Sequence, residues 1–478
     1  MTGSWWCIVS RHITTNQQPA TSNMYKTIAA LALILALPAF AQPNEQRLID
    51  HILTSSQGYE TLAYLTDEIG PRLSGSRNAE LAVRWTTQRF RDWGIDVRNE
   101  RVMVPHWVRG EERGRLVSHN DQKLFVTALG GSVATPAAGI TADVIEVSSY
   151  EQLAELGAAG KVKGKIVLYN LPMDMQLIES GRAFDAYSKA VVFRGIGASR
   201  AAEQGAVAAV VRSVASGSLR TPHTGSMRYL DEVPKKIPAA AVSTEDADFM
   251  HRLLAKGQRV RLNLVITPRM LPEVESANVI AEIRGSERPD EIVLIGGHLD
   301  SWDLGTGAID NGSGVSMVME TMRVLKELGI RPKRTIRAVL FMNEENGLRG
   351  GKKYFENAAK REELHRHVAV IETDAGAAPP VGFISTLEGA NLERVQARMR
   401  VLSRIAPMYF ESSQHTGADT SPLTDAGIPG FGLIPNPRHY FDYHHTPADT
   451  LDKVDPKALA QNTAALAALA YVLAEGGL

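Results

Sequence analysis

The sequence predicts an α/β protein with a mostly parallel mixed sheet flanked by helices and interrupted by a β-rich insertion. After residue 277, apolar strand-like runs alternate with helix-like segments, which is typical of parallel sheets covered on both faces. Residues 124–268 instead carry short β-type runs separated by Gly and Pro. The length of 478 residues and the hydrophobic content of 44% are those of an ordinary globular chain with two or three domains.

The charge balance and the cysteine count exclude several classes of function. The chain has 52 Lys and Arg against 53 Asp and Glu, so neither a nucleic-acid surface nor an anionic-membrane surface is expected. Cys7 is the only cysteine, which excludes an intrachain disulfide and a thiolate metal cluster. Any metal must therefore be held by nitrogen and oxygen atoms.

The N-terminus predicts an exported protein. Residues 24–41 contain an early lysine, an apolar run and a small-x-small motif, a pattern that predicts a signal peptide cleaved near Ala41 and Gln42. The apolar run is shorter than the about 20 residues that span a bilayer, so we expect a secreted or periplasmic protein with no membrane anchor. The stretch before Met24 does not resemble a signal peptide, which leaves Met1 and Met24 as alternative starts.

Residues 42–123 are expected to form the first part of a host domain. Apolar residues recur at helical spacing over 44–53 and 79–94, and Gly94 stands where a helix stop belongs. A strand is expected over 97–104. This part therefore predicts helices that lead into a sheet.

Residues 124–268 are expected to form a separate inserted module. Its clearest strand-like runs are 163–170, 206–213 and 236–243. A helix is expected over 197–205. Another begins at Ser243, and Asp246 occupies the capping-box position three residues later.

The host domain is expected to resume at residue 269 and to run to residue 478. Strands are expected at 277–283, 291–297, 335–342 and 367–372, with helices at 313–329 and from Gly351. The Ala-rich segment 456–475 contains Gln, Asn, Thr and Lys, which favours a helix packed on the sheet over a membrane anchor. In such sheets, binding sites lie beyond the carboxyl ends of the strands.

Two clusters of chemically active residues follow the strand at 291–297. His298 and Asp300 come first, and because side chains alternate, Asp300 can accept the second ring N–H of His298. Asp310 stands among glycines before the next helix. Taken singly, the pair is more typical of a polar loop, and Asp310 is more typical of a helix cap.

Further acids and histidines follow the later strands. Glu344 and Glu345 come after 335–342, and adjacent carboxylates repel each other unless a cation or solvent intervenes. Asp374 alone would be a turn residue more often than a ligand. His444 and His445 project differently from their loop, so at most one is expected to bind metal while the other lines the cleft.

Considered together, these groups favour a two-metal site. They belong to separate strand ends of one sheet, which converge on the same edge. Two imidazoles and three carboxylates suffice for two ions, each with one imidazole, one terminal carboxylate and a shared bridging Asp.

Four motifs in this region resemble the M28 metallopeptidases: "GHLDSWDLGTGAIDNGSG", "NEENG", "ETDAG" and "YHHTPADT". The likeness to one branch of that family extends over nearly the whole mature chain and includes "EIGPRLSGSRNAE" and "VPHWVRGEE". It implies a zinc-peptidase fold of the phosphorylase/hydrolase-like type. It also implies that the insertion is a protease-associated (PA) domain.

The resemblance further implies the metal ligands. His298 and Asp374 would hold one Zn²⁺ ion. Glu345 and His445 would hold the other, and Asp310 would bridge the two ions. Mn²⁺ or Co²⁺ would suit the same nitrogen and oxygen ligands.

The remaining candidate residues would act on the reacting atoms or on the ligands. By resemblance, Glu344 would be the general base, Asp300 would orient His298, and His444 would help to stabilise the oxyanion. Further candidates for the cleft wall are Thr224, His415, Asp419 and Thr420, for which turn and surface roles are the commoner alternatives.

The implied reaction is hydrolysis of a peptide bond by a metallo-exopeptidase. We rank a dipeptidase or carboxypeptidase acting on dipeptides and short peptides first, and an aminopeptidase second. A non-catalytic receptor on the same fold is the third alternative, and the retained ligand set argues against it. We expect the inserted module to shape or cover the cleft, or to mediate a homodimer.

Overall fold

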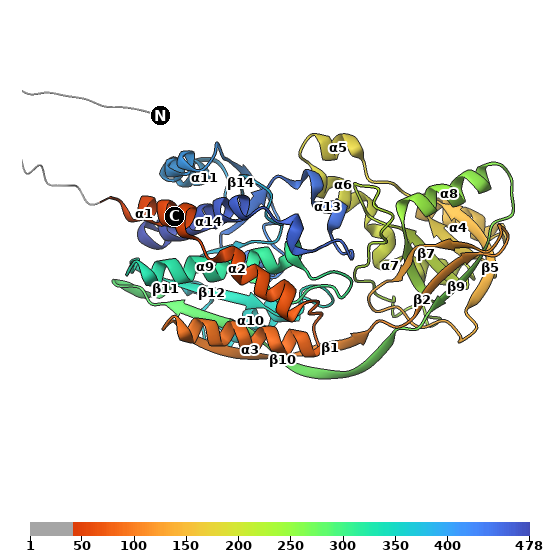
Figure 1. Cartoon of the computed structure of the whole chain (residues 1–478), viewed down its shortest axis with the longest axis horizontal. Coiled ribbons are helices and arrows are strands. Elements are labelled where there is room, and N and C mark those ends of the chain that lie inside the picture. The colour runs from red at the N-terminus through yellow and green to blue at the C-terminus, as the bar shows by residue number, and fades with distance from the viewer. Residues whose placement is uncertain (1–41) are drawn as a thin grey trace, which may run out of the picture. The chain divides into compact units, whose positions relative to one another are not determined.

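The computed structural model describes residues 42–478, and the predicted signal peptide and the choice of start lie outside the described residues. Two eight-stranded sheets organise the described chain (Figure 1). The first has the strand order β1-β10-β12-β11-β13-β16-β14-β15. The second has the order β3-β2-β9-β5-β6-β7-β8-β4.

The centre of the first sheet is parallel. Its four central strands are β12 (Arg334–Phe341), β11 (Arg288–His298), β13 (His367–Glu372) and β16 (Gly430–Pro435). Outside them, β10 (Arg269–Ile283) and β14 (Pro380–Ser385) run antiparallel to their neighbours, while the edge strand β15 (Tyr409–Ser412) is parallel to β14. The predicted mostly parallel mixed sheet is confirmed.

Helices cover both faces of this sheet because its central strands are apolar on both sides. Val293 and Ile295 of β11 join one apolar core, and Leu294 between them joins the other. The first core is covered by α1 (Asn44–Ser55), α3 (Arg77–Asp92), α9 (Ser313–Glu327) and α14 (Pro456–Gly476). The second is covered by α10 (Arg349–Lys360) and the short α12 (Ser421–Asp425).

The closing helix α14 is buried along most of its length, as the sequence predicts for a helix packed on the sheet. Among residues 42–478, the structure contains no helix with the length and apolar character needed to cross a membrane.

The second sheet carries the residues of the predicted insertion. Its strands are β2 (Glu112–Leu116), β3 (Gln122–Leu124), β4 (Val126–Ala128), β5 (Ile140–Val147), β6 (Ile166–Tyr169), β7 (Ala208–Arg212), β8 (Ala239–Val242) and β9 (Arg261–Ile266). The edge strands β3 and β4 are separated in the chain by Phe125 alone. Strands of this sheet thus begin at Glu112, before the expected start of the module at 124.

This module has more helix than the sequence suggests. The helix expected over 197–205 is α7 (Val192–Glu203), which begins earlier. The helices α4 (Tyr150–Ala158), α5 (Met175–Glu179) and α6 (Ala183–Ala190) are not predicted. Ala183, Ala186 and Ala190 of α6 pack into the core of the first sheet, so this helix belongs to the boundary between the two parts.

The expected capping box is only half formed. Ser243 caps α8 (Thr244–Ala255) by accepting a hydrogen bond from the N–H of Asp246 at 3.2 Å. The Asp246 carboxylate does not return to Ser243, however, but accepts from the N–H of Phe125 at 2.7 Å. The predicted capping-box role of the Asp246 side chain was wrong, because the N–H of Phe125 between two strands binds its carboxylate instead.

A long antiparallel ribbon connects the two sheets. It consists of β1 (Asp96–Val108) and β10, both longer than the strands predicted at 97–104 and 277–283, and Figure 1 shows the pair running from one sheet to the other. A register shift between Val104 and His106 interrupts the pairing.

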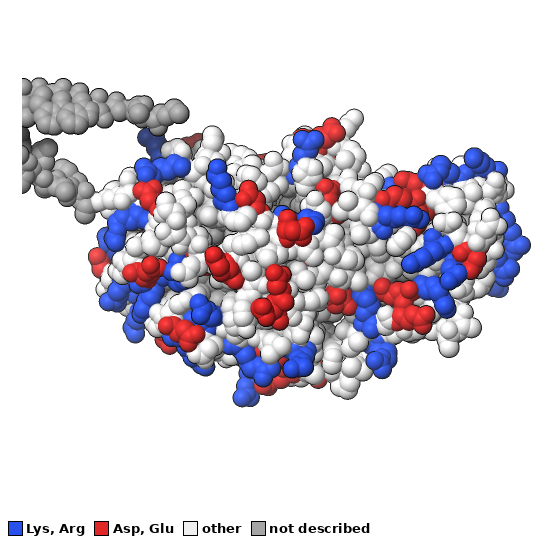
Figure 2. Space-filling model, viewed as in Figure 1, with Lys and Arg blue, Asp and Glu red and all other residues white. Residues whose placement is uncertain are grey.

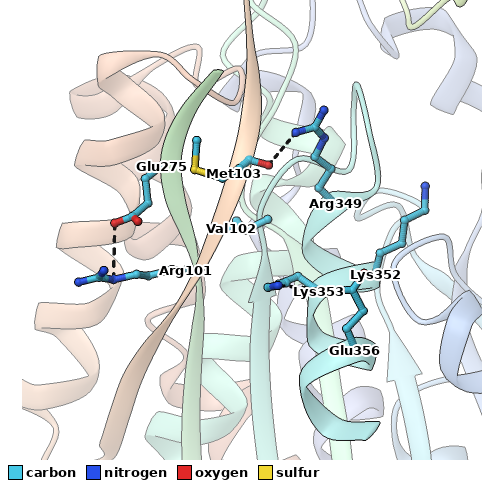
Figure 3. Close-up of a pocket in the computed structure, with 8 residues that line it drawn as sticks. All are labelled: Arg101, Val102, Met103, Glu275, Arg349, Lys352, Lys353 and Glu356. Carbon is cyan, nitrogen blue, oxygen red and sulfur yellow. Dashed lines mark hydrogen bonds and ion pairs between the residues drawn. The ribbon is translucent and has the colours of Figure 1, made fainter. Parts of the chain in front are cut away.

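The surface carries charges of both signs. Basic and acidic side chains are interspersed over most of the face in Figure 2. A cavity of about 310 Å³ lies between the ribbon and α10 (Figure 3). Its charges are largely paired, since Arg349 meets Glu273 at 2.6 Å and Lys353 meets Glu356 at 3.4 Å.

Candidate metal centre and peptide cleft

The predicted site residues come together beyond the carboxyl ends of three parallel strands. His298 is the last residue of β11, and Asp374 follows β13. Glu344 and Glu345 follow β12. The other members of the cluster are Asp310, Asp300, His444 and His445.

Asp310 lies between the two histidines that were predicted as ligands. Its Oδ1 is 3.1 Å from Nε2 of His298, and its Oδ2 is 3.2 Å from Nε2 of His445. Each imidazole also meets a second carboxylate, because His298 lies 3.2 Å from Asp374 and His445 lies 3.1 Å from Glu345. The carboxylate of Asp310 thus faces two His–carboxylate pairs, one on each oxygen.

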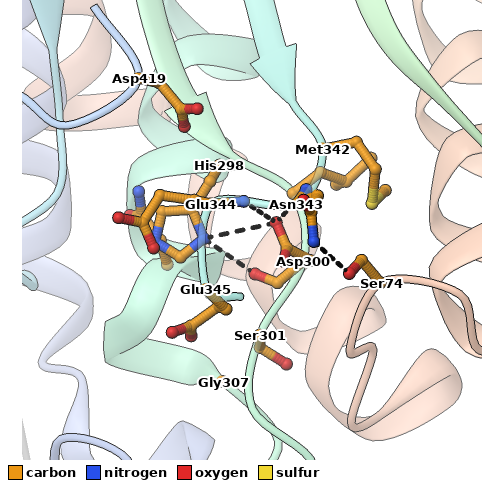
Figure 4. Close-up of polar contacts among 12 residues, drawn as sticks. Ser74, His298, Asp300, Ser301, Gly307, Met342, Asn343, Glu344, Glu345 and Asp419 are labelled. Atoms are coloured by element: carbon orange, nitrogen blue, oxygen red, sulfur yellow. Dashed lines mark hydrogen bonds and ion pairs between the residues drawn. The ribbon is translucent and has the colours of Figure 1, made fainter. Parts of the chain in front are cut away.

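Asp300 supports the site in a way that differs from the expectation. The backbone oxygen of Asp300, not its carboxylate, accepts from Nδ1 of His298 at 3.0 Å (Figure 4). The carboxylate oxygen Oδ1 is 3.9 Å from that nitrogen. It accepts instead from the N–H groups of Asn343 and Glu344 at 2.8 and 3.1 Å. Asp300 therefore joins the loop after β11 to the loop that carries the two glutamates.

Sequence reasoning missed Asp449, which holds the turn that presents Asp310. Its carboxylate accepts from three consecutive N–H groups, those of Ala308, Ile309 and Asp310, at 2.9, 2.7 and 3.2 Å. Asp449 lies inside the "YHHTPADT" motif, where only its spacing from the histidines could have drawn attention to it.

Arg72 is the second residue that the sequence did not reveal. Its buried guanidinium donates to the backbone oxygens of Leu299, Thr306 and Gly307 at 2.7, 2.7 and 2.9 Å. Three donors of one planar group thereby hold the glycine-rich loop between His298 and Asp310 in place. Arg72 is part of the "EIGPRLSG" stretch, but a contact so distant in the chain leaves no local pattern.

The inserted module contributes to the position of His445. Thr224 accepts from Nδ1 of His445 through its backbone oxygen at 3.2 Å, and its own N–H donates to the backbone oxygen of His445 at 3.0 Å. The ring of Trp302 packs against His445 with 5.7 Å between centroids. The hydrogen bond to Thr224 thus holds Nδ1 of His445, which orients Nε2 toward Asp310 and Glu345.

His444 stacks on His445 with 3.5 Å between the ring centroids, and its Nε2 is 3.5 Å from Oδ2 of Asp310. Both histidines therefore approach the cluster, whereas neighbouring histidines were expected to project differently. Burial and the charge of His445 lower the pKa of His444 well below its usual value. His444 is accordingly a neutral imidazole in the cleft wall.

Burial and crowded charge set the proton affinities of the cluster. Burial opposes the charge on His445, but Glu345 and Asp310 outweigh it and raise the pKa of His445 to about 9. Burial, with Asp310 nearby, raises the pKa of Glu345 to about 7. Burial also raises the pKa of Glu344 well above its usual value, and the negative charges of Asp374 and Glu345 add to the effect.

This donor set fits divalent cations. One ligand atom from each of His298, Asp310 and Glu345 lies within 4.8 Å of the others, and all three residues are buried. Imidazole nitrogen with carboxylate oxygen is a donor set that suits Zn²⁺. Several buried carboxylates at close quarters need positive charge to balance them, which protons on the histidines supply here and metal ions would supply better.

A cleft of about 440 Å³ opens beside the cluster. On one side it is lined by Asp310, Glu344, Glu345, Asp374, His444 and His445. The other side is largely aromatic and includes Phe184 and Tyr187 from the inserted module. The Glu344 side chain is half-buried in this cleft and forms no ion pair within residues 42–478 that the structure shows, so it is available to a bound molecule.

Of the other residues considered for the cleft wall, none lines this cleft with its side chain. Asp419 and Thr420 donate their N–H groups to the buried carboxylate of Glu372 at 3.2 and 2.8 Å, a structural role. His415 is exposed. Thr224 acts through its backbone, as described above.

The chain is similar to known proteins over most of its length. Residues 278–470 match the model of peptidase family M28, and residues 122–249 match the PA domain. Human carboxypeptidase Q is 38% identical over 424 residues, which cover 88% of this chain and 86% of that protein. Aminopeptidase YwaD of Bacillus subtilis is 24% identical, with 85% of this chain and 82% of the relative covered.

A solved structure is similar over nearly the whole chain. The crystal structure of a peptidase M28 precursor from Shewanella amazonensis SB2B has 39% sequence identity and a TM-score of 0.85. The similarity covers 91% of this chain and 97% of that one.

Proposed function

The chain belongs to peptidase family M28 and is a metal-dependent peptide hydrolase, and from this premise we propose that it is a two-metal exopeptidase that cleaves dipeptides and short unblocked peptides. The observation that carries the proposal is Asp310, whose two carboxylate oxygens each face one His–carboxylate pair. A shared carboxylate between two such pairs is what a site for two neighbouring ions requires.

In this proposal, five residues hold the ions. His298 and Asp374 hold one, Glu345 and His445 hold the other, and Asp310 bridges them. We propose Zn²⁺ as the ion, and Mn²⁺ or Co²⁺ would fit the same donors. When bound, such a pair lowers the pKa of a shared water and polarises the scissile carbonyl.

Glu344 is the proposed general base. Its side chain lines the cleft and is not committed to an ion pair, so it can take the proton of the attacking water and pass it to the leaving amine. Because burial raises its pKa, the carboxylate binds the proton strongly enough to hold it between the two transfers. The neutral His444 can donate a hydrogen bond to the developing oxyanion.

The proposal about which end of the peptide is read is supported by the relatives rather than by the metal site. The similarity to carboxypeptidase Q over 88% of the chain supports a dipeptidase or carboxypeptidase. The weaker similarity to an aminopeptidase makes release of N-terminal residues the second candidate. A non-catalytic receptor on the same fold is disfavoured. A receptor without metal ions would not need to keep the metal-binding side chains together in one cluster, as this chain does.

A small substrate panel tests the proposal. Free dipeptides, N-blocked dipeptides and C-amidated dipeptides are offered to the protein with and without a chelator. We expect chelator-sensitive hydrolysis of the free dipeptides. Equal hydrolysis of amidated and free substrates would favour the aminopeptidase. The absence of chelator-sensitive hydrolysis of every substrate would contradict the proposed metal-dependent exopeptidase.

We further propose that the protein acts outside the cytoplasm, in the periplasm or the medium, on the basis of the signal-like residues 24–41. Determination of the N-terminal residue of the protein recovered from those fractions tests this, with Gln42 expected. A homodimer stays a prediction that sedimentation measurements address.

A further inference from the structure

The inserted module places one cation in the cleft. Arg194 lies in the first turn of α7 and is the only Lys or Arg that lines the cleft in the described part of the chain. The acidic cluster lines the same cleft. A positive group and a metal-binding cluster in one cleft would match a substrate with two unlike ends.

The guanidinium of Arg194 is held firmly but is not saturated. It donates one hydrogen bond to the hydroxyl of Tyr187, and its Cζ lies 5.4 Å from the centroid of that ring. It also lies against the backbone of Gly225, where a Cβ atom would be only 2.5 Å from Cζ. These contacts fix the side chain at a place that a larger residue at position 225 would block.

The remaining donors of Arg194 have no acceptor. Its Nε is buried and has no hydrogen-bond partner, and the structure shows no carboxylate within ion-pair distance of it among residues 42–478. An arginine in such surroundings normally meets an anion, because a buried donor without a partner costs free energy. Tyr187 accepts from Arg194 and keeps its own O–H proton for donation, so the pair offers several donors to one planar group.

Aromatic rings link Arg194 to the metal-binding cluster. The ring of Tyr187 stacks edge-on against His444 with 5.4 Å between centroids, and His444 in turn contacts Asp310. Arg194 and the cluster are therefore linked through two adjoining rings, those of Tyr187 and His444. The scissile carbonyl and the terminal carboxylate of a dipeptide are only one residue apart, so a cation and a metal-binding cluster that line one cleft can contact both.

We propose that Arg194, with Tyr187, binds the free C-terminal carboxylate of the substrate and so makes the enzyme selective for dipeptides and other peptides with a nearby free carboxyl end. The inference rests on the proposed peptidase function and adds the residue that reads the substrate. The inserted module then supplies specificity, while the first sheet supplies the hydrolytic groups.

The test compares three substrates within each protein preparation. Ala-Ala has the terminal carboxylate, Ala-Ala-NH₂ lacks it, and Ala-Glu-NH₂ has a side-chain carboxylate only. For Arg194→Met we expect the ratio of kcat/KM for Ala-Ala to that for Ala-Ala-NH₂ to fall by about 10- to 100-fold, mainly through KM. Because it is a ratio, it does not depend on the fraction of active protein.

Two further variants make the result specific. Arg200→Met is the matched control, since Arg200 lies on the same helix and pairs with Glu203 at 3.1 Å, and its ratio should equal that of the wild type. Arg194→Lys keeps the charge but loses the planar fork, so its ratio should fall by less than that of Arg194→Met. It also provides a reading if the methionine variant does not fold.

Three outcomes would each contradict a different claim: the role of Arg194, the recognition of the terminal carboxylate, or the peptidase function. An unchanged ratio in Arg194→Met, with chelator-sensitive hydrolysis intact, would refute the role of Arg194 and leave the peptidase standing. A loss confined to Ala-Glu-NH₂ would overturn the terminal assignment and point to acidic side chains. If the wild type showed no chelator-sensitive hydrolysis of Ala-Ala, the proposed function itself would fail.

Discussion

At the scale of single residues, the site depends on carboxylates with different neighbours. Asp310 is charged between two imidazoles, and their hydrogen bonds outweigh burial and lower its pKa well below the usual value. Glu344 lies in the same cleft without such partners, and burial raises its pKa. Asp310 and Glu344, which line the same cleft, thus have opposite affinities for a proton, and this difference separates the proposed bridging ligand from the proposed general base.

Replacement of Glu344 by Gln tests that separation. The amide keeps the shape of the side chain but cannot take a proton, so we expect kcat to fall by about 10³-fold while the metal content stays unchanged. Metal analysis and turnover of a free dipeptide check this. Glu356→Gln on the surface of α10 is the control, and near-normal activity of Glu344→Gln would show that another group is the base.

Asp449 should control metal affinity without touching the metal. In Asp449→Asn, the amide nitrogen would face backbone N–H groups that now donate to a carboxylate. We expect the turn bearing Asp310 to loosen and metal affinity to drop about 10- to 100-fold. Competition with a chelator measures this affinity. The exposed Asp452→Asn should behave like the wild type, and equal affinities for all three proteins would refute the role of Asp449.

At the scale of elements, a hydrogen bond fastens α10 to the sheet. Tyr354 of α10 donates its hydroxyl proton to Nε2 of His367 at 2.8 Å, and His367, at the start of β13, donates through Nδ1 to the backbone of Glu363 at 3.0 Å. Burial, with the charge of Arg337 nearby, lowers the pKa of His367 to about 4. The folded state therefore requires a neutral imidazole at this position.

Stability should consequently depend on pH through His367. Its folded pKa lies below the unfolded value, so its contribution is complete above about pH 6.5 and is lost as pH falls toward 4, about 3 kcal/mol in all. We expect the thermal midpoint of the wild type to fall more steeply over this range than that of His367→Gln. The exposed His365→Gln is the control, and identical pH profiles for all three would contradict the prediction.

The elements also show what sequence patterns can and cannot reveal. The strands β11, β12 and β13 are predicted closely because short continuous apolar runs rich in Val and Ile are typical of buried strands. The polar first half of β10 has no such signal, since it belongs to a ribbon outside the sheet core. The helix α5 is five residues long, too short for a helical period to be recognised.

The site could be predicted as a set of residues but not as a network. Acids and histidines at successive strand ends are visible in the sequence because a parallel sheet delivers them to one edge. The atom that binds Nδ1 of His298 cannot be predicted from the sequence, because both the backbone oxygen and the carboxylate of Asp300 could accept from it. The contacts of Arg72 and Arg194 join distant segments, so only the fold reveals them.

At the scale of the whole molecule, the inserted module and the first sheet share a core. Phe441 is buried and stacks on Tyr187 of the module with 4.7 Å between centroids, and Phe184 packs against its edge at 5.2 Å. Ser216 donates to Asp442 at 2.7 Å beside them. With an apolar boundary of this kind, we expect the two parts to unfold together rather than as independent domains.

Calorimetry tests this cooperativity. The wild type should unfold in one transition, whereas Phe441→Ala should separate it into two, because loss of a buried Phe costs about 3–5 kcal/mol at the boundary. Phe355→Ala, on α10 away from the boundary, should lower the midpoint without a split. Two transitions in the wild type would show that the module is thermally independent.

His445, Asp449 and α14 lie late in the sequence, which determines when a chain under synthesis can become an active peptidase. Synthesis must pass residue 449 before the proposed second histidine ligand and the residue that anchors the turn of Asp310 are both present. Chains that stop before residue 445 accordingly lack part of the proposed site. We expect such truncated chains to show no peptidase activity.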